Sequence, residues 1–417
     1  MFSPINKIQE KFNNKETRVV ASNFVWLSML QVASYVFPLI TIPYLARVIG
    51  SHGFGEIAFA SAIMVWIQTI ADWGFNLTAT RDIAQNRDDK EKISHIFSAV
   101  IYSRILLSVV AFIILLILVV SIPRFYESAP IILLTFLMVP GHILYPTWFF
   151  QAIEKMRYIT LLSVLMKAIF TVAVFVFIRS SEDYILYPLL MSLGYIFSGV
   201  LAIYLVLIRW EYKLCTVSFK EIIYTIRQST NVFINTLAPN LYNSFSTVLL
   251  GFYGTNKDLG IYDGGIKFTQ LGERFLVVVE QTFFPFLSRR IDKHKIYAKL
   301  NFFASLLIAT ILFFAAPLLV DWFLSDEFRQ SVVVIRIRAV SLVFFALSNI
   351  YGKNYLILRH KDKVLRKITL YCSIVGFIIA WPLSYYWGYV GSAFTVTISL
   401  FLMALFTYLS ARKIMKN

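Results

Sequence analysis

Seven basic side chains fall inside apolar stretches of the sequence, where a cation requires either an acidic partner or contact with water. They are Arg104, Lys167, Lys267, Arg274, Arg336, Arg338 and Lys353. Acidic side chains at comparable positions are fewer, namely Asp72, Glu273 and Glu280. An ionised side chain near the centre of a bilayer costs at least about 2.5 kcal/mol on insertion scales, so it normally faces a partner or a water-filled cavity. The excess of cations therefore predicts a wet passage that attracts an anion.

The types of the basic side chains indicate which anion this is. The planar guanidinium group of arginine can donate two parallel hydrogen bonds to a phosphate, and such charge-assisted bonds are stronger in a partly desolvated cavity than in water. We therefore expect a substrate that carries phosphate. The predicted substrate-binding residues are Arg47, Arg104, Lys167, Lys267, Arg274, Arg338 and Lys353.

The position of each cation along its helix separates two interpretations. Arg47, Arg104 and Lys353 lie near helix ends, where a long aliphatic stem can carry the charge to the lipid headgroups. For these three residues both this interpretation and a cavity position stay open. Lys167 and Arg274 lie near the middle of a helix, where the headgroups are harder to reach, and this favours the cavity.

One predicted helix, residues 261–288, carries the densest polar pattern. Its Asp263, Lys267 and Arg274 are spaced i, i+4, i+11 and fall on one stripe, with Gln270 beside them. We interpret this stripe as part of the wall of the passage. The competing interpretation is an internal salt-bridge ladder that starts with Asp263 and Lys267 and only satisfies the helix.

The elements that position these residues follow from composition. The chain has 417 residues, 39 Lys and Arg against 23 Asp and Glu, a formal charge of +16, 58% hydrophobic residues and only 15% charged residues. This composition excludes an ordinary soluble domain and indicates a membrane protein. The basic residues cluster between apolar runs, so the charge reflects membrane topology and not nucleic-acid binding. Cys215 and Cys372 lie far apart, and neither belongs to a pattern typical of a disulfide framework or a zinc site.

Hydropathy predicts an all-α membrane protein with twelve transmembrane helices. Seven stretches of 19 or more residues contain no charged residue and meet the length of about 20 residues needed to cross a bilayer. They are 19–46, 105–123, 128–153, 184–208, 228–256, 300–320 and 368–411. The last is long enough for two helices joined by a short turn around Trp381-Pro382 and Gly388. Four further stretches contain embedded charges, namely 54–80, 158–178, 261–288 and 330–358.

Loop charges predict the orientation of these spans. Loops on the side of the N-terminus hold 27 Lys and Arg residues, whereas the opposite loops hold 5. Because basic loops stay in the cytoplasm, we expect both termini to be cytoplasmic. Met1–Arg18 is polar and basic, and the first apolar stretch is too long for the core of a signal peptide, so we expect the first helix to remain in the mature protein.

An internal repeat divides the chain into two halves. The segment 90–93 recurs as 293–296, an offset of 203, and Gly50 with Ile57 recurs as Gly254 with Ile261, an offset of 204. Each half has six predicted spans, an even number, so the halves enter from the same side as parallel repeats, and transporters place a site between such lobes. We predict an N-lobe over 1–208, a cytoplasmic linker over 209–227 and a C-lobe over 228–417.

Three motifs in the first half point to a family. The sequence reads RVIGSHGFGEIAFA over 47–60, DWGF over 72–75 and RDIA over 81–84. With the order and spacing of the twelve spans, the whole chain resembles a Wzx-type O-antigen flippase. This is the polysaccharide transporter branch of the multidrug/oligosaccharidyl-lipid/polysaccharide exporter (MOP) superfamily, whose fold is shared by the multidrug and toxin extrusion (MATE) transporters.

The resemblance implies a V-shaped carrier with two lobes, located in the bacterial inner membrane. It implies movement of an undecaprenyl-diphosphate-linked oligosaccharide from the cytoplasmic to the outer leaflet by alternating access, with no cofactor. It also implies coupling to a proton or cation gradient, for which Asp72, Glu273 and Glu280 are the candidate acids. An ion pair with Arg104 is the alternative role of Asp72. The expected partners are the lipid-linked oligosaccharide and membrane lipid, and the resemblance allows association with a polysaccharide polymerase and a chain-length regulator.

Three alternative functions agree less well with the sequence. A multidrug or cation antiporter of the same superfamily would need acids in its passage, often in the first helix, and 19–46 contains none. An O-antigen polymerase or a lipid-linked glycosyltransferase would need a large outer loop, whereas all predicted outer loops are short. No nucleophile constellation, nucleotide-binding loop or metal cluster is present in the sequence, so we do not expect an enzyme. The branch that flips the peptidoglycan precursor usually has two more spans than predicted for this chain.

Overall fold

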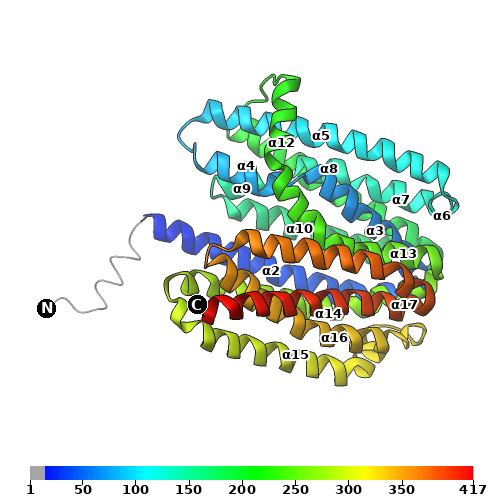
Figure 1. Ribbon diagram of the computed structural model, residues 1–417. Helices are drawn as coiled ribbons and strands as arrows, with labels where there is room; N and C mark the ends of the chain where they lie inside the picture. Colours follow the sequence, from blue (N-terminus) through cyan, green and yellow to red (C-terminus); the bar gives the residue numbers. More distant parts are fainter. Residues whose placement is uncertain (1–14, 417) are drawn as a thin grey trace.

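The computed structural model describes the backbone of residues 15–416 and the side chains of residues 22–415 except 24 and 285. Most of the predicted polar segment Met1–Arg18 lies outside the described residues. Within them the chain is helical and contains no strand. Figure 1 shows the long helices running side by side, with the start of the first described helix and the end of the last at the left-hand end of the bundle. We call this the terminal end, and the opposite end the distal end.

The first half of the chain forms ten α-helices. They are α2 (Lys15–Val48), α3 (Gly50–Asp72), α4 (Phe75–Ala84), α5 (Lys90–Ser121), α6 (Pro123–Glu127), α7 (Ala129–Phe136), α8 (Met138–Leu144), α9 (Thr147–Ala152), α10 (Met156–Phe177) and α11 (Leu186–Tyr204). A 3₁₀ turn at Ser181–Ile185 precedes α11, and a π turn at Leu205–Arg209 follows it. The predicted fourth span, 128–153, is therefore a chain of short helices, α7 to α9.

The second half forms six α-helices. They are α12 (Phe219–Leu237), α13 (Ser244–Tyr253), α14 (Asn256–Arg289), α15 (His294–Phe323), α16 (Ser331–Tyr351) and α17 (Asp362–Lys416). A 3₁₀ turn at Ala238–Leu241 joins α12 to α13. The backbone of Gly388 has φ 53° and ψ −131°, so α17 is a pair of helices joined at this glycine, as the length of 368–411 predicted.

Nine helices of the described chain are long and apolar enough to cross a membrane, which makes this a multi-pass membrane protein. The last of the nine is the α17 pair. The predicted spans 228–256 and 261–288 are not among the nine: the first is interrupted at Ala238–Leu241, and α14 carries the embedded charges. The all-α membrane fold is thus confirmed, while the count of twelve spans stays a prediction.

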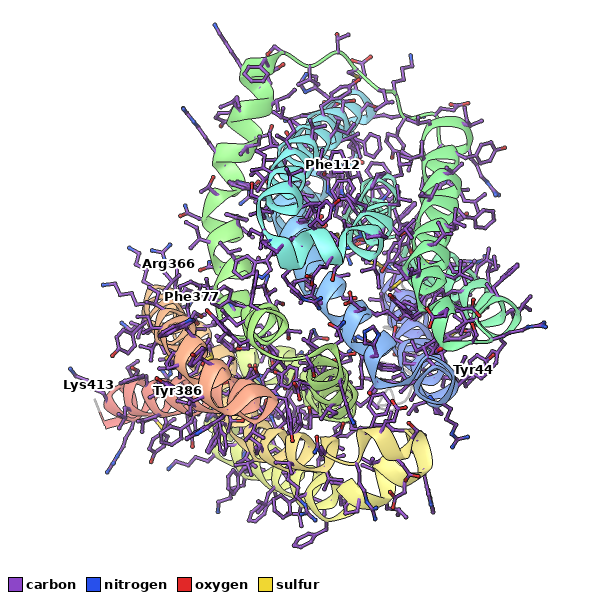
Figure 2. All side chains as sticks on the ribbon, turned by 90° about the vertical axis from the view of Figure 1, so that its right-hand side faces the viewer. Tyr44, Phe112, Arg366, Phe377, Tyr386 and Lys413 are labelled. Carbon is purple, nitrogen blue, oxygen red and sulfur yellow. The ribbon has the colours of Figure 1, made fainter. Side chains whose placement is uncertain are left out.

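The helices pack as two groups. Those from α2 to α11 contact mainly one another, as do those from α13 to α17. Figure 2, seen from the distal end, shows Phe112 of α5 in the upper group, and Phe377 and Tyr386 of α17 in the lower group. The most extensive contact between the groups is that of α3 with α14.

Two glycines allow α3 and α14 to cross closely near their N-terminal ends. A Cβ atom at Gly55 would lie 1.8 Å from the backbone oxygen of Asn256, and one at Gly260 would lie 1.9 Å from that of Ser51. Any larger residue would therefore push the helices apart. Small residues have the same role where membrane helices approach closely in general. The glycine-rich segment that carries the family motif thus sets the contact between the two groups.

Helix α12 extends across the first group of helices. The ring of Phe233 stacks on that of Trp73 at 3.8 Å, and the Ser229 and Thr78 hydroxyls hydrogen-bond at 2.7 Å. Trp73 also donates a hydrogen bond to the Thr230 hydroxyl at 3.3 Å. Beyond the 3₁₀ turn, α13 packs on α17 instead. Because α12 begins at Phe219, the second half of the predicted linker 209–227 is helical.

Candidate functional site

A cavity of about 310 Å³ lies between α2, α3, α10 and α11 of the first group and α14 of the second. Three of the predicted substrate-binding cations line it, namely Lys167 from α10 and Lys267 and Arg274 from α14. All four members of the predicted stripe on α14 line the cavity, because positions i, i+4, i+7 and i+11 share one face of a helix. The lining also includes Ser34 and the Tyr187 ring.

The charges in this cavity do not cancel. Lys267 forms an ion pair with Asp263 at 3.1 Å, which is the first step of the salt-bridge ladder considered above. Lys167 donates a hydrogen bond to the Ser34 hydroxyl at 2.5 Å and has no acidic partner among the described side chains. Arg274 is exposed and has neither an ion pair nor a hydrogen bond within the described part of the chain. Three cations against one carboxylate leave an electropositive cavity, which attracts anions.

The other four predicted cations lie elsewhere, so the predicted set does not converge on one site. Arg47 is exposed and donates to the backbone oxygen of Trp322 at 3.0 Å. The remaining three, Arg104, Arg338 and Lys353, each form an ion pair outside the cavity, described next. Three of the seven predicted cations thus share one cavity and four lie outside it, while their role in binding stays a prediction. Position along a helix could not show which acids the neighbouring helices supply.

All three candidate coupling acids form ion pairs with these cations. Glu273 binds Arg338 at 2.8 Å, and Arg338 is only 4% exposed. Glu280 binds Lys353 at 3.3 Å. Asp72 binds Arg104, the alternative considered from the sequence, and accepts a contact from His142 at 3.2 Å. Arg104 and Arg338 are buried whereas Lys353 is exposed, and a buried ion that loses its partner is strongly destabilising, so the first two pairs also stabilise the fold.

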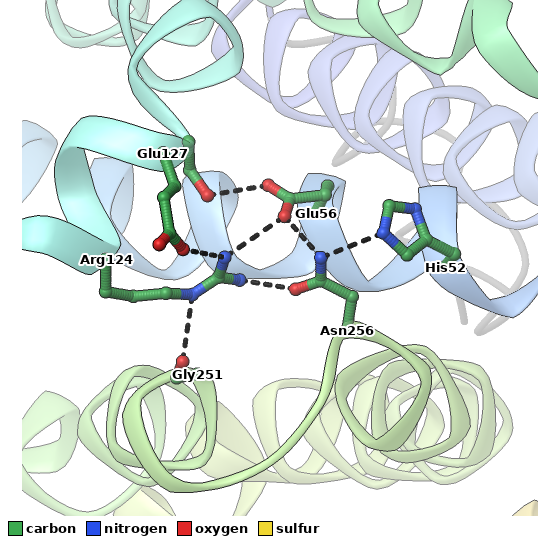
Figure 3. A network of polar contacts seen from close by, with 7 residues as sticks. His52, Glu56, Arg124, Glu127, Gly251 and Asn256 are labelled. Carbon is green, nitrogen blue, oxygen red and sulfur yellow. Dashed lines mark hydrogen bonds and ion pairs between the residues drawn. The ribbon is translucent and has the colours of Figure 1, made fainter.

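A polar network, drawn in Figure 3, joins the two groups beside α6, which lies at the distal end in Figure 1. The Glu56 carboxylate of α3 accepts hydrogen bonds from Ser128 at 2.8 Å and from Asn256 at 2.6 Å, and it pairs with Arg124 at 3.2 Å. Arg124 in turn donates to the backbone oxygen of Gly251 at 2.9 Å. Since Asn256 and Gly251 belong to the second group, the network holds the groups together. We call these residues, with His52, the interlobe network.

A second contact between the groups lies beside this network. The backbone N–H and the hydroxyl of Ser51 both donate to the Glu327 carboxylate at 2.8 Å. These hydrogen bonds favour the ionised form and lower the pKa of the Glu327 carboxyl below its usual value. Neither contact follows from the sequence patterns described above, although one signal was available. Glu56 is an acid inside the apolar stretch 54–80 and is only 6% exposed in the structure.

Comparison with known proteins identifies the family. The family model described as "Polysaccharide biosynthesis protein" matches residues 20–291. A relative from Escherichia coli (strain K12) named "Putative O-antigen transporter" is 27% identical over 382 residues, covering 90% of this chain and 92% of the relative. A relative of the same name from Shigella dysenteriae is 26% identical over 389 residues, covering 92% of this chain and 98% of the relative.

Solved structures identify the fold. The lipid II flippase MurJ in an inward closed conformation matches with a TM-score of 0.77 at 13% identity, covering 92% of this chain and 87% of that one. An inward-facing MATE transporter of the MOP superfamily matches with a TM-score of 0.72 at 13% identity, covering 94% and 98%. The predicted MOP fold is thus confirmed. The chain belongs to the polysaccharide biosynthesis protein family, as its sequence motifs predicted.

Proposed function

We propose that this protein is a flippase that moves an undecaprenyl-diphosphate-linked oligosaccharide, an O-antigen or related repeat unit, from the cytoplasmic to the outer leaflet of the bacterial inner membrane. The two relatives named as O-antigen transporters support this class of substrate, and the family supports transport rather than catalysis. The observation that carries the proposal is the electropositive cavity between the two groups of helices, lined by Lys167, Lys267 and Arg274.

These three cations differ in what they can offer a diphosphate. Arg274 is exposed and unpaired within the described chain, so its guanidinium group can take two phosphate oxygens without giving up another partner. Lys167 gives up its hydrogen bond to the Ser34 hydroxyl when it binds a phosphate oxygen. Lys267 binds the phosphate while its ion pair with Asp263 is kept. We therefore assign the main contact to Arg274. The lipid tail stays in the bilayer, and the glycan crosses through water between the lobes.

The interlobe network supports a direction for loading. It joins the groups at the distal end, and the charge rule assigns the terminal end to the cytoplasm. A cavity that is closed at the distal end accepts substrate from the cytoplasmic side, where lipid-linked repeat units are expected. Opening of the distal end then releases the substrate to the outer leaflet.

Net transport requires a source of free energy, because binding alone only redistributes a carrier between its states. We propose coupling to a proton or cation gradient through Asp72, Glu273 or Glu280, whose ion pairs with basic residues are lost when the acid is protonated. Removal of the product by an associated polymerase and chain-length regulator would act in the same direction.

The experiment is complementation of a strain that lacks this protein, with the leaflet of the lipid-linked oligosaccharide as the readout. We expect accumulation at the cytoplasmic face in the deletion strain, rescue by the wild-type chain, and at least a tenfold loss of rescue with Arg274→Ala plus Lys167→Ala, since two charge-assisted bonds contribute roughly 3 kcal/mol or more. Arg274→Lys should retain part of the activity.

The matched control is Arg366→Ala, an exposed basic residue outside the cavity and labelled in Figure 2, which should rescue fully. Unpolymerised units at the outer face of the deletion strain would indicate a polymerase instead of a flippase. Restored resistance to cationic drugs without movement of the lipid would indicate a multidrug antiporter.

A further inference from the structure

A second cavity, of about 220 Å³, lies between α3 and α4 on one side and α12 on the other. A water molecule takes up about 30 Å³ in the liquid, so this cavity can hold a polar group larger than several waters. Its lining differs from that of the first cavity, because it contains no basic residue. The polar lining residues are Gln68, Thr69, Asp72, Asn76 and Thr236.

Both cavities lie along one face of α3. Phe54 and Ile57 line the first cavity, while Val65, Gln68 and Asp72 line the second. These positions are spaced by 3, 8, 3 and 4 residues, so they form one stripe at about 100° per residue. Gln68 lies eleven positions after Ile57, about 16 Å along the helix axis. A substrate with its phosphates in the first cavity can therefore extend along α3 into the second.

The surface between the two cavities is accessible. Ser61 lies on the same stripe, between Ile57 and Val65, and its side chain is exposed although α3 lies between the two groups of helices. The stripe that joins the two cavities is therefore open at Ser61, where no packed side chain covers it.

Polar groups in the second cavity have unused hydrogen-bonding capacity. The Asn76 Oδ1 atom is buried and has no hydrogen-bond partner. The Gln68 side chain has none among the described residues either. Asp72 is held by Arg104, by His142 and by the Asn76 amide N–H, which donates to it at 3.4 Å, and these contacts fix the orientation of its carboxylate. An amide both donates and accepts, and a carboxylate accepts, so this set matches sugar hydroxyls, which also do both.

The charges near this cavity do not favour phosphate. Arg104 forms an ion pair with Asp72, a residue that lines this cavity, and its side chain is only 1% exposed. The guanidinium group of Arg104 orients the Asp72 carboxylate, and because it is buried and paired it is not available to bind an anionic ligand. Phosphate would meet Asp72 without a free basic side chain, whereas neutral hydroxyl groups carry no such penalty.

We propose that the second cavity is a glycan subsite, which binds hydroxyl groups of the sugars while the diphosphate occupies the first cavity. This inference deepens the proposed function and rests on it. Gln68 and Asn76 recognise the sugar from the first lobe, and Thr236 closes the subsite from α12. The stacking of Trp73 on Phe233 fixes α12 beside the subsite, so Thr236 is held in position.

The test compares two substrates in the deletion strain. One host makes the complete lipid-linked repeat unit, and the other makes only its first sugar on the same lipid diphosphate. The variants are Gln68→Met and Thr236→Val, which keep side-chain volume and remove hydrogen-bonding groups. We expect each to lower translocation of the complete unit about fivefold, the effect of losing one hydrogen bond, while translocation of the single-sugar lipid changes less than about twofold. Arg274→Ala should lower both.

The matched controls are Gln85→Met, an exposed glutamine after α4, and Thr225→Val on α12, whose hydroxyl hydrogen-bonds the backbone as that of Thr236 does. Protein amounts in the membrane are measured for every variant. Unchanged translocation of the complete unit, or equal losses for the two substrates, would overturn the glycan subsite while leaving the flippase intact. Failure of the wild-type chain to move either lipid would overturn the flippase and the subsite with it.

Discussion

Among single residues, Arg338 differs from the cations of the electropositive cavity because it forms a buried ion pair with Glu273. The Arg338 side chain is 4% exposed, lies 2.8 Å from the carboxylate and does not line the electropositive cavity. Removing one partner of a buried pair leaves an uncompensated charge, whereas replacing both with residues of similar size is far better tolerated. The pair should therefore behave as a unit in stability measurements.

We predict that Arg338→Met alone destabilises the protein by about 3 kcal/mol or more, and that Arg338→Met combined with Glu273→Gln recovers most of this loss. The measurement is thermal unfolding of the purified protein in detergent, with the two single variants and the double variant. Lys167→Met is the control, because its ammonium group has no acidic partner in the described chain and its loss should change stability little. Equal unfolding temperatures of single and double variants would contradict the pair.

The same residues show what sequence reasoning could reach. Lys167 and Arg274 were assigned to a cavity from their mid-helix positions, and both line one. Helical periodicity fixes which side chains share a face of their own helix, and this was enough for the stripe on α14. It does not reveal which residue of another helix lies opposite. The partners of Arg338, Lys353 and Glu56 therefore required the structure.

At the scale of elements, the crossing of α3 and α14 depends on the absence of side chains at Gly55 and Gly260. A Cβ at Gly260 would overlap the backbone of Ser51, which cannot move aside as a side chain would. Helix α3 also carries Glu56 of the interlobe network and Ser51 of the contact with Glu327. A shift of the crossing thus weakens all distal contacts together.

We predict that Gly260→Ala destabilises the protein by roughly 1–3 kcal/mol, the usual cost of overpacking, and weakens the distal closure. Gly272→Ala on the same helix is the control, because its Cβ would meet only ends of flexible side chains, the nearest at 3.0 Å. The unfolding temperature is measured for both variants. A cysteine is introduced at the distal end of each, and the rate at which a water-soluble reagent labels it is measured. The same labelling rate in the two variants would argue against a role of the crossing in closure.

The bounds of α12 differ from those that hydropathy predicts. The stretch 228–256 was predicted as one span, whereas the helix breaks at Ala238–Leu241. That α12 begins at Phe219 and packs on the first group was not predicted, because a polar, basic segment looks like a linker when charge alone is considered. The contact of Trp73 with Phe233 joins positions far apart in sequence, which periodicity does not report.

At the scale of the whole molecule, the fold class was predictable because bilayer thickness and loop charge constrain every span in the same way. The family was predictable from the resemblance that the motifs at 47–60, 72–75 and 81–84 carry. The relation between the two groups of helices was not, because no hydropathy signal distinguishes a surface that faces lipid from one that faces the other lobe. In this structure the interlobe network and the contact of Ser51 with Glu327 join the groups at the distal end. Alternating access then requires these contacts to break.

We predict that joining the groups permanently at the distal end abolishes transport. His52 of α3 and Asn256 of α14 belong to different groups of helices, and their side-chain nitrogens lie 3.0 Å apart. The pair His52→Cys and Asn256→Cys can therefore be bridged by a short bifunctional thiosulfonate, which forms a disulfide with each thiol, releases two sulfinate groups and is cleaved again by a reductant. Cys215→Ser removes the competing thiol that is not buried. Translocation should stop on bridging and return on cleavage, whereas each single cysteine variant should stay active. Because the reagent adds no charge to the cavity, a loss of activity reports opening and not substrate affinity. Continued transport by the fully bridged protein would mean that the distal end does not open, and the substrate would have to leave by another route.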